Sequence, residues 1–136
     1  MTDPAGRLET LGRWAEALAR PGFSMGSWVA PEERAPGVFQ VGWFELGDEG
    51  RQFIDDVRRG GWVQPFPWMD WLGTPEGQAL RRSPELVARA TEEDLQRLLT
   101  SIVRGERFSD GTIEGALESG MLLAIARRAR DLADAG

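Results

Sequence analysis

Apolar side chains near the start of the chain recur every three or four residues, the spacing of one face of an α-helix. The dipeptide Asp3-Pro4 predicts where this helix begins, since Asp is a favoured N-cap and Pro suits the first helical position. Pro21-Gly22 predicts where it ends. The positions expected to face the core are Leu8, Leu11, Trp14 or Ala15, and Leu18.

The segment after this helix is rich in prolines and glycines. Residues 22–37 contain three such breaks, which is typical of a loop, so no regular structure is expected there. Val38 to Phe44 is the one stretch with the valine and aromatic content of a strand. No other stretch offers a partner strand, and a strand without a partner is unstable in water. The sequence therefore predicts at most one short strand, near 38–44.

Capping signals predict three helices in the middle of the chain. One starts at an acidic residue and stops at a pair of glycines, the residue type that favours helix C-termini. Two shorter helices each start with Thr or Ser as the N-cap and proline at the first helical position. The expected ranges are 48–59 ahead of Gly60-Gly61, about 75–82 after Thr74, and about 84–90 after Ser83.

The next helix has the clearest amphipathic pattern. Thr91 caps it, Asp94 three residues later forms a variant of the capping box, and Gly105 stops it. Its apolar stripe holds Leu95, Leu98, Leu99, Ile102 and Val103. Arg97 and Arg104 lie together on the opposite face, which predicts either a solvated surface or a two-arginine site for an anion or a partner.

Ser109-Asp110 predicts the cap of a last helix over about 110–133. Apolar side chains cover most of its circumference, a pattern typical of a helix that is buried on more than one side. Such a helix would lie at the centre of the domain or at the interface of a homodimer. Gly120 falls inside its apolar arc, which predicts the close approach of a neighbouring element. Together these patterns predict an all-α or nearly all-α fold, a small single-domain multi-helix bundle over residues 1–136.

The composition removes several kinds of chemistry. The 136 residues include no Cys and no His, and all 16 basic residues are Arg. These absences exclude disulfides, zinc–sulfur sites, Ser-His-Asp and Cys-His catalysis within one chain, and a standard phosphate-binding loop, which needs Lys. The net charge of −6 disfavours nucleic acid and anionic membranes as partners. No cofactor is expected.

The N-terminal segment and the lengths of the apolar runs indicate the cellular compartment of the protein. No apolar run approaches the roughly 20 residues that a membrane span needs, and the polar, acidic start of the chain is unlike a signal peptide. Both features favour a cytoplasmic protein. The exclusive use of Arg, together with abundant Ala and Gly, is typical of a GC-rich bacterial coding sequence.

One candidate site is an ion pair near the last helix. Glu118 falls between apolar positions of that helix, where a carboxylate would be partly buried and would need a partner. We expect it to pair with Arg107, or with Arg104, across the turn that joins the last two helices. Such a pair would either hold the fold together or bind a ligand.

The other candidate is a tryptophan-rich segment. Trp62, Trp68 and Trp71 lie within ten residues, and their rings supply either core or an aromatic groove for an apolar ligand or a peptide. In the groove, Asp70 would be the polar contact. The other acids that could join Asp70 at a Mg²⁺ site are Asp55, Asp56 and Glu118, although no spacing requires such a site.

Two blocks of the chain carry a family resemblance. One reads Phe66-Pro67-Trp68-Met69-Asp70-Trp71, and the other reads Leu98-Leu99-Thr100-Ser101-Ile102-Val103-Arg104, followed by Arg107-Phe108, Gly111 and Glu118-Ser119-Gly120. Over about 48–133 the chain resembles a family of small bacterial and phage proteins, the domain of unknown function 6508. Pro67 stands where the family pattern has Asp, so any role of that carboxylate is absent or has passed to Asp70. The resemblance implies a shared fold and a candidate surface rather than a reaction.

The absence of His, Cys and Lys, together with a set of Arg, Trp and Phe residues suited to recognition, predicts a non-catalytic binding or protein-interaction module, with a protein or peptide as its partner. The alternative is a carboxylate-based enzyme that depends on a divalent metal, and three acids converging in one pocket would favour it. Nucleic-acid binding would need one continuous patch of Arg97, Arg104, Arg127, Arg128 and Arg130. The candidate binding residues, as a surface or a structural junction, are Trp68, Asp70, Trp71, Arg104, Arg107, Phe108 and Glu118.

Overall fold

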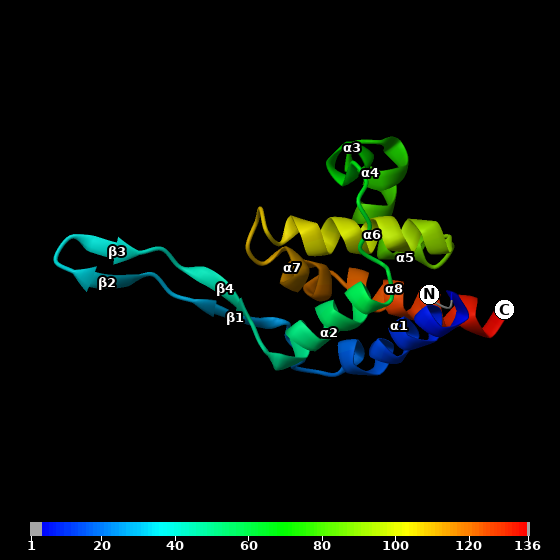
Figure 1. The fold of residues 1–136 in the computed structure, drawn as a ribbon, viewed down its shortest axis with the longest axis horizontal. Helices are drawn as coiled ribbons and strands as arrows, with labels where there is room; N and C mark the ends of the chain where they lie inside the picture. The colour runs from blue at the N-terminus through cyan, green and yellow to red at the C-terminus, as the bar shows by residue number, and fades with distance from the viewer. Residues whose placement is uncertain (1–3, 136) are drawn as a thin grey trace.

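The computed structural model describes residues 4–135 as a helical body from which a long two-stranded arm projects (Figure 1). The helices are α1 (Pro4–Ala19), α2 (Asp48–Arg59), α3 (Trp68–Leu72), α4 (Pro75–Arg82), α5 (Pro84–Val87), α6 (Glu92–Gly105), α7 (Thr112–Glu118) and α8 (Met121–Ala135). The strands are β1 (Gly26–Val29), β2 (Glu32–Ala35), β3 (Val38–Gln40) and β4 (Trp43–Leu46). The described chain is therefore mostly helical, as predicted, but it is not strictly all-α.

The arm corrects both predictions for residues 22–44. β1 pairs antiparallel with β4 and β2 with β3, so the chain runs out along one side of the arm and returns along the other. The stretch predicted as a loop supplies β1 and β2, and the strand predicted near 38–44 is in fact two strands, each with a partner. The breaks that indicated a loop mark the midpoint of the arm at Pro31 and its tip at Pro36-Gly37, where Gly37 has a φ of +79°.

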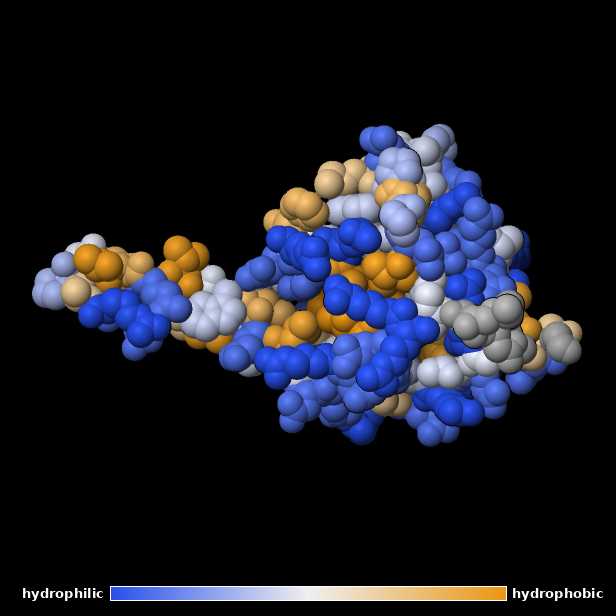
Figure 2. Space-filling model, viewed as in Figure 1, coloured by the Kyte–Doolittle hydropathy of each residue, from blue (hydrophilic) through white to orange (hydrophobic). Residues whose placement is uncertain are grey.

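The base of the arm is fixed to the body. The rings of Trp28 and Phe44 meet edge to face across the two strands, with their centroids 5.2 Å apart. The Phe44 amide donates a hydrogen bond of 3.2 Å to the Asp110 carboxylate, in the turn before α7. A Cβ at Gly111 would lie 2.4 Å from the Trp28 ring, so only glycine allows this contact. Further out, hydrophobic side chains of the arm are exposed to solvent (Figure 2).

The last helix lies inside the body, as its all-round apolar pattern predicts. α8 packs against α1 over much of its length, and it also contacts α5, α6 and α7. Its buried side chains are Met121, Leu122, Ile125, Ala126 and Ala129. α1 faces it with Leu8, Leu11, Ala15 and Leu18, which are the positions expected from the sequence, with Ala15 rather than Trp14 fully buried.

The predicted helix over 110–133 is two helices. α7 ends at Glu118 with Ser119 as its C-cap, and Gly120 adopts a left-handed φ of +84° before α8 begins. A glycine in this conformation is a common helix terminator, because it carries no Cβ to clash. Nothing lies within 4 Å of a Cβ built at Gly120, so the predicted close approach of a neighbouring element is wrong. The start is also later than predicted, with Gly111 as the N-cap.

Most other helix boundaries follow the capping signals. Thr74 caps α4 by accepting from the Gly77 amide, and Thr91 and Asp94 form the predicted capping box of α6. α5 is shorter than predicted and ends at Val87. The predicted N-cap Asp3 lies outside the described residues. No helix within residues 4–135 has the length and apolar character to cross a membrane.

Candidate functional site

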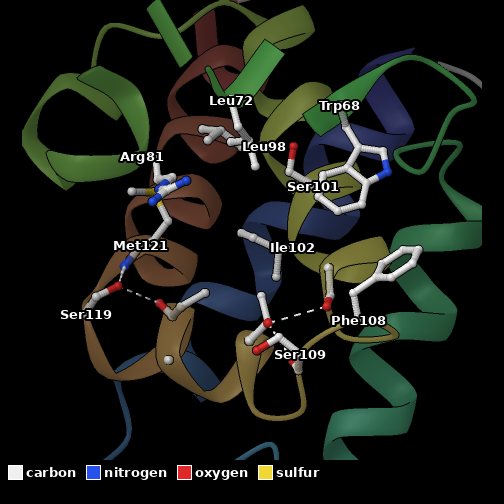
Figure 3. A pocket seen from close by; sticks show the side chains of 14 residues that line it. Trp68, Leu72, Arg81, Leu98, Ser101, Ile102, Phe108, Ser109, Ser119 and Met121 are labelled. Carbon is white, nitrogen blue, oxygen red and sulfur yellow. Dashed lines mark hydrogen bonds between the residues drawn. The ribbon is translucent and has the colours of Figure 1, made fainter. Parts of the chain in front are cut away.

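An open apolar cleft of about 420 Å³ lies between α3, α6 and α7 (Figure 3), and we call it the α6–α7 cleft. Its apolar lining comes from Trp68, Leu72, Leu98, Ile102, Phe108, Ala116 and Met121. α7 turns its small residues toward this space, and Gly115 has nothing within 4 Å of where a Cβ would be. The cleft exists because these small side chains leave the gap between α6 and α7 unfilled.

Hydroxyl groups in the cleft wall are largely occupied by the backbone. Ser101 donates to the Arg97 carbonyl at 2.8 Å, and Thr112 donates to the Ser109 carbonyl at 2.6 Å. Ser119 donates to the Ala116 carbonyl at 3.2 Å. A ligand in the cleft therefore meets a surface that is apolar in behaviour, because these donors are already engaged.

Arg81 is the one charged side chain among the residues that line the cleft. It comes from the last turn of α4, is exposed, and forms no ion pair with another residue of the described chain. In Figure 3 it lies at the end of the cleft near Ser119 and Met121, whereas Trp68 and Phe108 lie at the other end. The cleft thus has an aromatic end and a cationic end.

The structure brings together only two of the residues that the sequence singles out as a site. Trp68 and Phe108 both line the cleft, with ring centroids 6.0 Å apart, and Phe108 is 73% exposed. Trp71 is buried in the core, and its indole nitrogen has no hydrogen-bond partner among the described residues. Asp70 is exposed and lies outside the cleft lining.

The expected ion pair of Glu118 is wrong. Glu118 is exposed, and the ion pairs found within residues 4–135 include neither Glu118 nor Arg107. The error comes from treating 110–133 as one continuous helix. Because the helix is broken at Gly120, the apolar side chains of α8 do not flank Glu118 as the prediction assumed. Arg104 is half-buried, and its Nε has no hydrogen-bond partner in the described chain.

The buried carboxylate of this region is Glu114 instead. It accepts from the Ser24 hydroxyl at 2.7 Å and from the Met25 amide at 3.3 Å, which ties α7 to the chain entering the arm. Glu106 similarly accepts from the amides of Gly111 and Ile113, both at 2.9 Å. Both carboxylates hold backbone, so their role is structural.

Sequence reasoning missed Arg81 and the small face of α7. Thr112, Gly115, Ala116 and Ser119 recur at helical spacing and line the cleft. Small residues spaced in this way are a signal that could have indicated a hollow beside α7. Arg81 carries no comparable signal, because its neighbour Arg82 has the same residue type and exposure but does not line the cleft.

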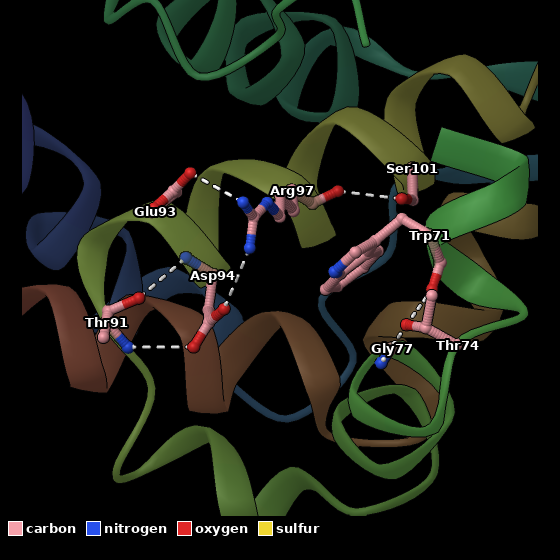
Figure 4. Close-up of polar contacts among 8 residues, drawn as sticks. All are labelled: Trp71, Thr74, Gly77, Thr91, Glu93, Asp94, Arg97 and Ser101. Atoms are coloured by element: carbon pink, nitrogen blue, oxygen red, sulfur yellow. Dashed lines mark hydrogen bonds and ion pairs between the residues drawn. The ribbon is translucent and has the colours of Figure 1, made fainter. Parts of the chain in front are cut away.

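Two carboxyl groups meet where α4 approaches the start of α6. A hydrogen bond and repulsion from Asp94 raise the pKa of the exposed Glu76 carboxyl above 4.5. Asp94 itself accepts from the Thr91 amide at 3.2 Å, and Arg97 lies 3.8 Å from it (Figure 4). Arg97 also contacts Glu93 at 2.6 Å, so this arginine belongs to a local ion-pair network.

Substitutions at these two carboxyl groups should have opposite effects on stability. Glu76→Gln removes the repulsion between the two side chains and should raise the free energy of unfolding at pH 7 slightly, by about 0.5 kcal/mol or less. This gain should shrink as the pH falls toward 4.5, because protonation of Glu76 relieves the wild type as well. Asp94→Ala removes the capping box and should cost about 1 kcal/mol. Thermal unfolding at pH 7 and pH 4 checks both, and a lower Tm for Glu76→Gln at pH 7 would contradict the assignment.

The described residues offer no ligand set for a metal ion. Within residues 4–135, no three acidic side chains gather closely enough to hold one.

The arginines that a nucleic-acid surface would need are also engaged separately, since Arg128 donates to the Ala90 carbonyl and Arg130 to the Gly12 carbonyl.

Comparisons with known proteins identify a family and nothing beyond it. No curated protein and no solved structure matches the chain. Residues 4–135 match the family described as a family of unknown function, DUF6508. This match includes α1 and the arm, which the resemblance over about 48–133 leaves out. The chain therefore belongs to the family of unknown function DUF6508.

Proposed function

We propose that the protein is a non-catalytic binding module whose α6–α7 cleft holds the apolar part of a ligand that also carries one acidic group. The observation that carries this proposal is the cleft itself, about 420 Å³ of apolar space with Arg81 as its charged lining residue. Ligand sites commonly have volumes of about 300–1,000 Å³, largely apolar walls and a few polar groups that fix orientation.

The groups that line the cleft favour binding over a reaction. Its lining includes no carboxylate, and the chain has no Cys, His or Lys to act as nucleophile or base. The hydroxyls of Ser101, Thr112 and Ser119 donate to backbone carbonyls. The alternative of a metal-dependent carboxylate enzyme lacks a supporting cluster of acids within residues 4–135.

The two ends of the cleft indicate the chemistry of the ligand. The rings of Trp68 and Phe108 suit a flat or branched apolar group at one end. The Arg81 guanidinium at the other end suits a carboxylate, which it can bind through charge-assisted hydrogen bonds. A small amphipathic acid and an apolar peptide segment with a carboxylate both present this chemistry, and separate titrations with decanoate and with such a peptide distinguish them.

Gly115→Leu tests whether the cleft is the site. The new side chain would enter open space in the cleft, so it should block a ligand without straining α7. We expect binding of the fluorescent probe 1-anilinonaphthalene-8-sulfonate, an aromatic monoanion, to weaken at least about tenfold. Glu118→Leu is the matched control, because Glu118 is exposed on the same helix but lies outside the cleft lining. Equal probe affinity in wild type and Gly115→Leu would overturn the proposal.

Arg81→Ala tests the cationic end of the cleft. Losing a hydrogen bond to a charged partner costs about 1.5–3 kcal/mol, so probe affinity should fall about tenfold or more. Arg82→Ala removes the same charge from the neighbouring position, which is exposed and does not line the cleft. It should leave the affinity nearly unchanged. Equal losses in both variants would assign the effect to net charge instead of to a contact in the cleft.

A further inference from the structure

The outer half of the arm exposes apolar side chains that nothing in the described chain covers. Phe39 is 66% and Val41 is 81% exposed, and every residue of β2 is exposed. β2 and β3 pair only with each other, so both edges of this ribbon have unpaired backbone groups. A two-stranded ribbon is marginally stable by itself in water, and exposed apolar groups of this kind mark interaction surfaces. The arm therefore has the features of a segment that is covered in an assembly.

A second surface lies where the arm joins the body, in a furrow of about 460 Å³ that we call the basal furrow. Its floor is apolar and comes from β4, α2 and the end of α6, with Phe44, Ile54 and Val103. Arg51, Arg58 and Arg107 line its sides and are all exposed. Figure 2 shows hydrophobic side chains between bands of hydrophilic ones on this side of the body.

The arginines of the basal furrow are available to a partner. Arg58 and Arg107 form no ion pair within residues 4–135, and Arg51 approaches only Asp48, at 3.9 Å. Three carboxylates also line the furrow. Asp110 accepts from the Phe44 amide and Glu106 accepts from amides at the start of α7, whereas Glu45 is exposed and forms no ion pair within residues 4–135. The furrow thus offers an apolar floor with two unpaired arginines, Arg58 and Arg107, and one exposed acid, Glu45, at its sides.

The residues at the tip of the arm are complementary in chemistry to those of the basal furrow. Glu32 lies opposite Gln40 and Glu33 opposite Phe39, beside the exposed apolar side chains. Glu33 accepts from the Gly37 amide at 3.1 Å, so Glu32 is the acid of the tip that no backbone amide engages within residues 4–135. Arg34 is the one basic residue of the tip, and its Nε bonds to Gln40. An apolar tip that carries Glu32 matches an apolar floor beside the unpaired Arg58 and Arg107. The tip cannot reach the furrow of its own chain, because the arm holds the two about 30 Å apart at 3.3 Å per residue.

We propose that the arm is a dimerisation arm, and that its tip binds in the basal furrow of a second copy. Two arms lying side by side and antiparallel about a twofold axis place each tip at the base of the other arm. Both contacts then form at once and the assembly closes as a dimer. The same arrangement lets the unpaired edges of the two ribbons hydrogen-bond to each other.

Disulfide trapping tests this geometry directly, because the chain contains no cysteine. Val38→Cys marks the tip and Glu45→Cys marks the base, and both positions are exposed. Under mild oxidation the double variant should form a covalent dimer, whereas each single variant should stay largely uncrosslinked. A covalent dimer from Val38→Cys alone would mean that the arms meet tip to tip and would overturn the proposal. So would the absence of any crosslinked dimer.

A charge exchange tests the predicted complementarity, with sedimentation equilibrium as the measurement. Arg58→Glu should weaken dimerisation at least about tenfold, because it places a carboxylate in the furrow against the acidic tip. Arg59→Glu is the matched control, since Arg59 is exposed next to it on α2 but does not line the furrow. Adding Glu32→Arg to Arg58→Glu should restore part of the affinity. Equal effects of the two single variants, or a wild type that stays monomeric at every concentration, would overturn the proposal.

Discussion

Trp62→Ala is expected to lower the free energy of unfolding by about 3–5 kcal/mol, the usual cost of removing a large buried aromatic ring. Trp62 is 1% exposed and lies where α1, the end of α2 and α6 meet, next to Leu11 and Val57. Because total stabilities are about 5–15 kcal/mol, this one substitution would remove a large share. Urea unfolding followed by far-UV circular dichroism measures it without relying on tryptophan fluorescence.

Polar contacts around Trp62 add to this expected effect. The Arg7 guanidinium lies 4.0 Å from the Trp62 ring centre, and Arg7 also bonds Glu92 at 2.8 Å. The Trp62 carbonyl accepts from the Thr100 hydroxyl at 2.9 Å, and the same hydroxyl accepts from the Gln64 amide. The residue therefore links α1 to α6 through both its ring and its backbone.

Phe108→Ala is the control for the loss of a large apolar group. Phe108 is mostly exposed, so its removal should change the free energy of unfolding by about 0.5 kcal/mol or less. If Trp62→Ala cost no more than Phe108→Ala, the junction of α1, α2 and α6 would not be the packed core that the structure shows.

Gly50→Ala should have the second large effect, and we expect it to lower the free energy of unfolding by about 3 kcal/mol. Gly50 lies in the first turn of α2, and a Cβ there would stand 2.1 Å from the Met25 carbonyl oxygen. The clash is with backbone that also accepts from the Gly47 amide at 2.9 Å, so neither side can move freely. The helix start would have to shift away from the chain that enters the arm.

The same substitution at Gly115 should change the free energy of unfolding in the opposite direction. Gly115 is also helical, but a Cβ there would meet nothing within 4 Å. Alanine favours the helix over glycine by about 0.5–1 kcal/mol, so Gly115→Ala should stabilise the protein. Parallel urea titrations of Gly50→Ala and Gly115→Ala compare the two, and effects of equal sign would contradict the contact at Met25.

The helices could be predicted because their signals are local. Thr74 with Pro75, and Thr91 with Asp94, fix helix starts through contacts within four residues, and the structure confirms both. Gly120 shows the limit of this reasoning, because the same glycine fits a helix interior and a helix end. Only its left-handed φ distinguishes the two, and the position of Glu118 depends on that choice.

Only the returning side of the arm could be predicted, as one strand near 38–44, because the strands of the outgoing side lack the pattern that reveals a strand. β2 is exposed on both faces, so Glu32, Glu33 and Arg34 show no alternation of apolar and polar residues. The α6–α7 cleft was equally hidden, since it depends on how α3 and α4 pack beside α6. Of its lining, the sequence pointed to Trp68 and Phe108 and missed Arg81 and Gly115.

The most direct test of the binding module is to map a ligand on the protein by amide chemical shifts. Uniformly ¹⁵N-labelled protein would be titrated with decanoate, an apolar chain with one carboxylate. The shifts should change in a saturable way and gather on α3, the second half of α6, α7 and the amides near Arg81. Saturable changes that gather elsewhere, or shifts that do not respond to decanoate or to the acidic peptide, would contradict binding in the α6–α7 cleft.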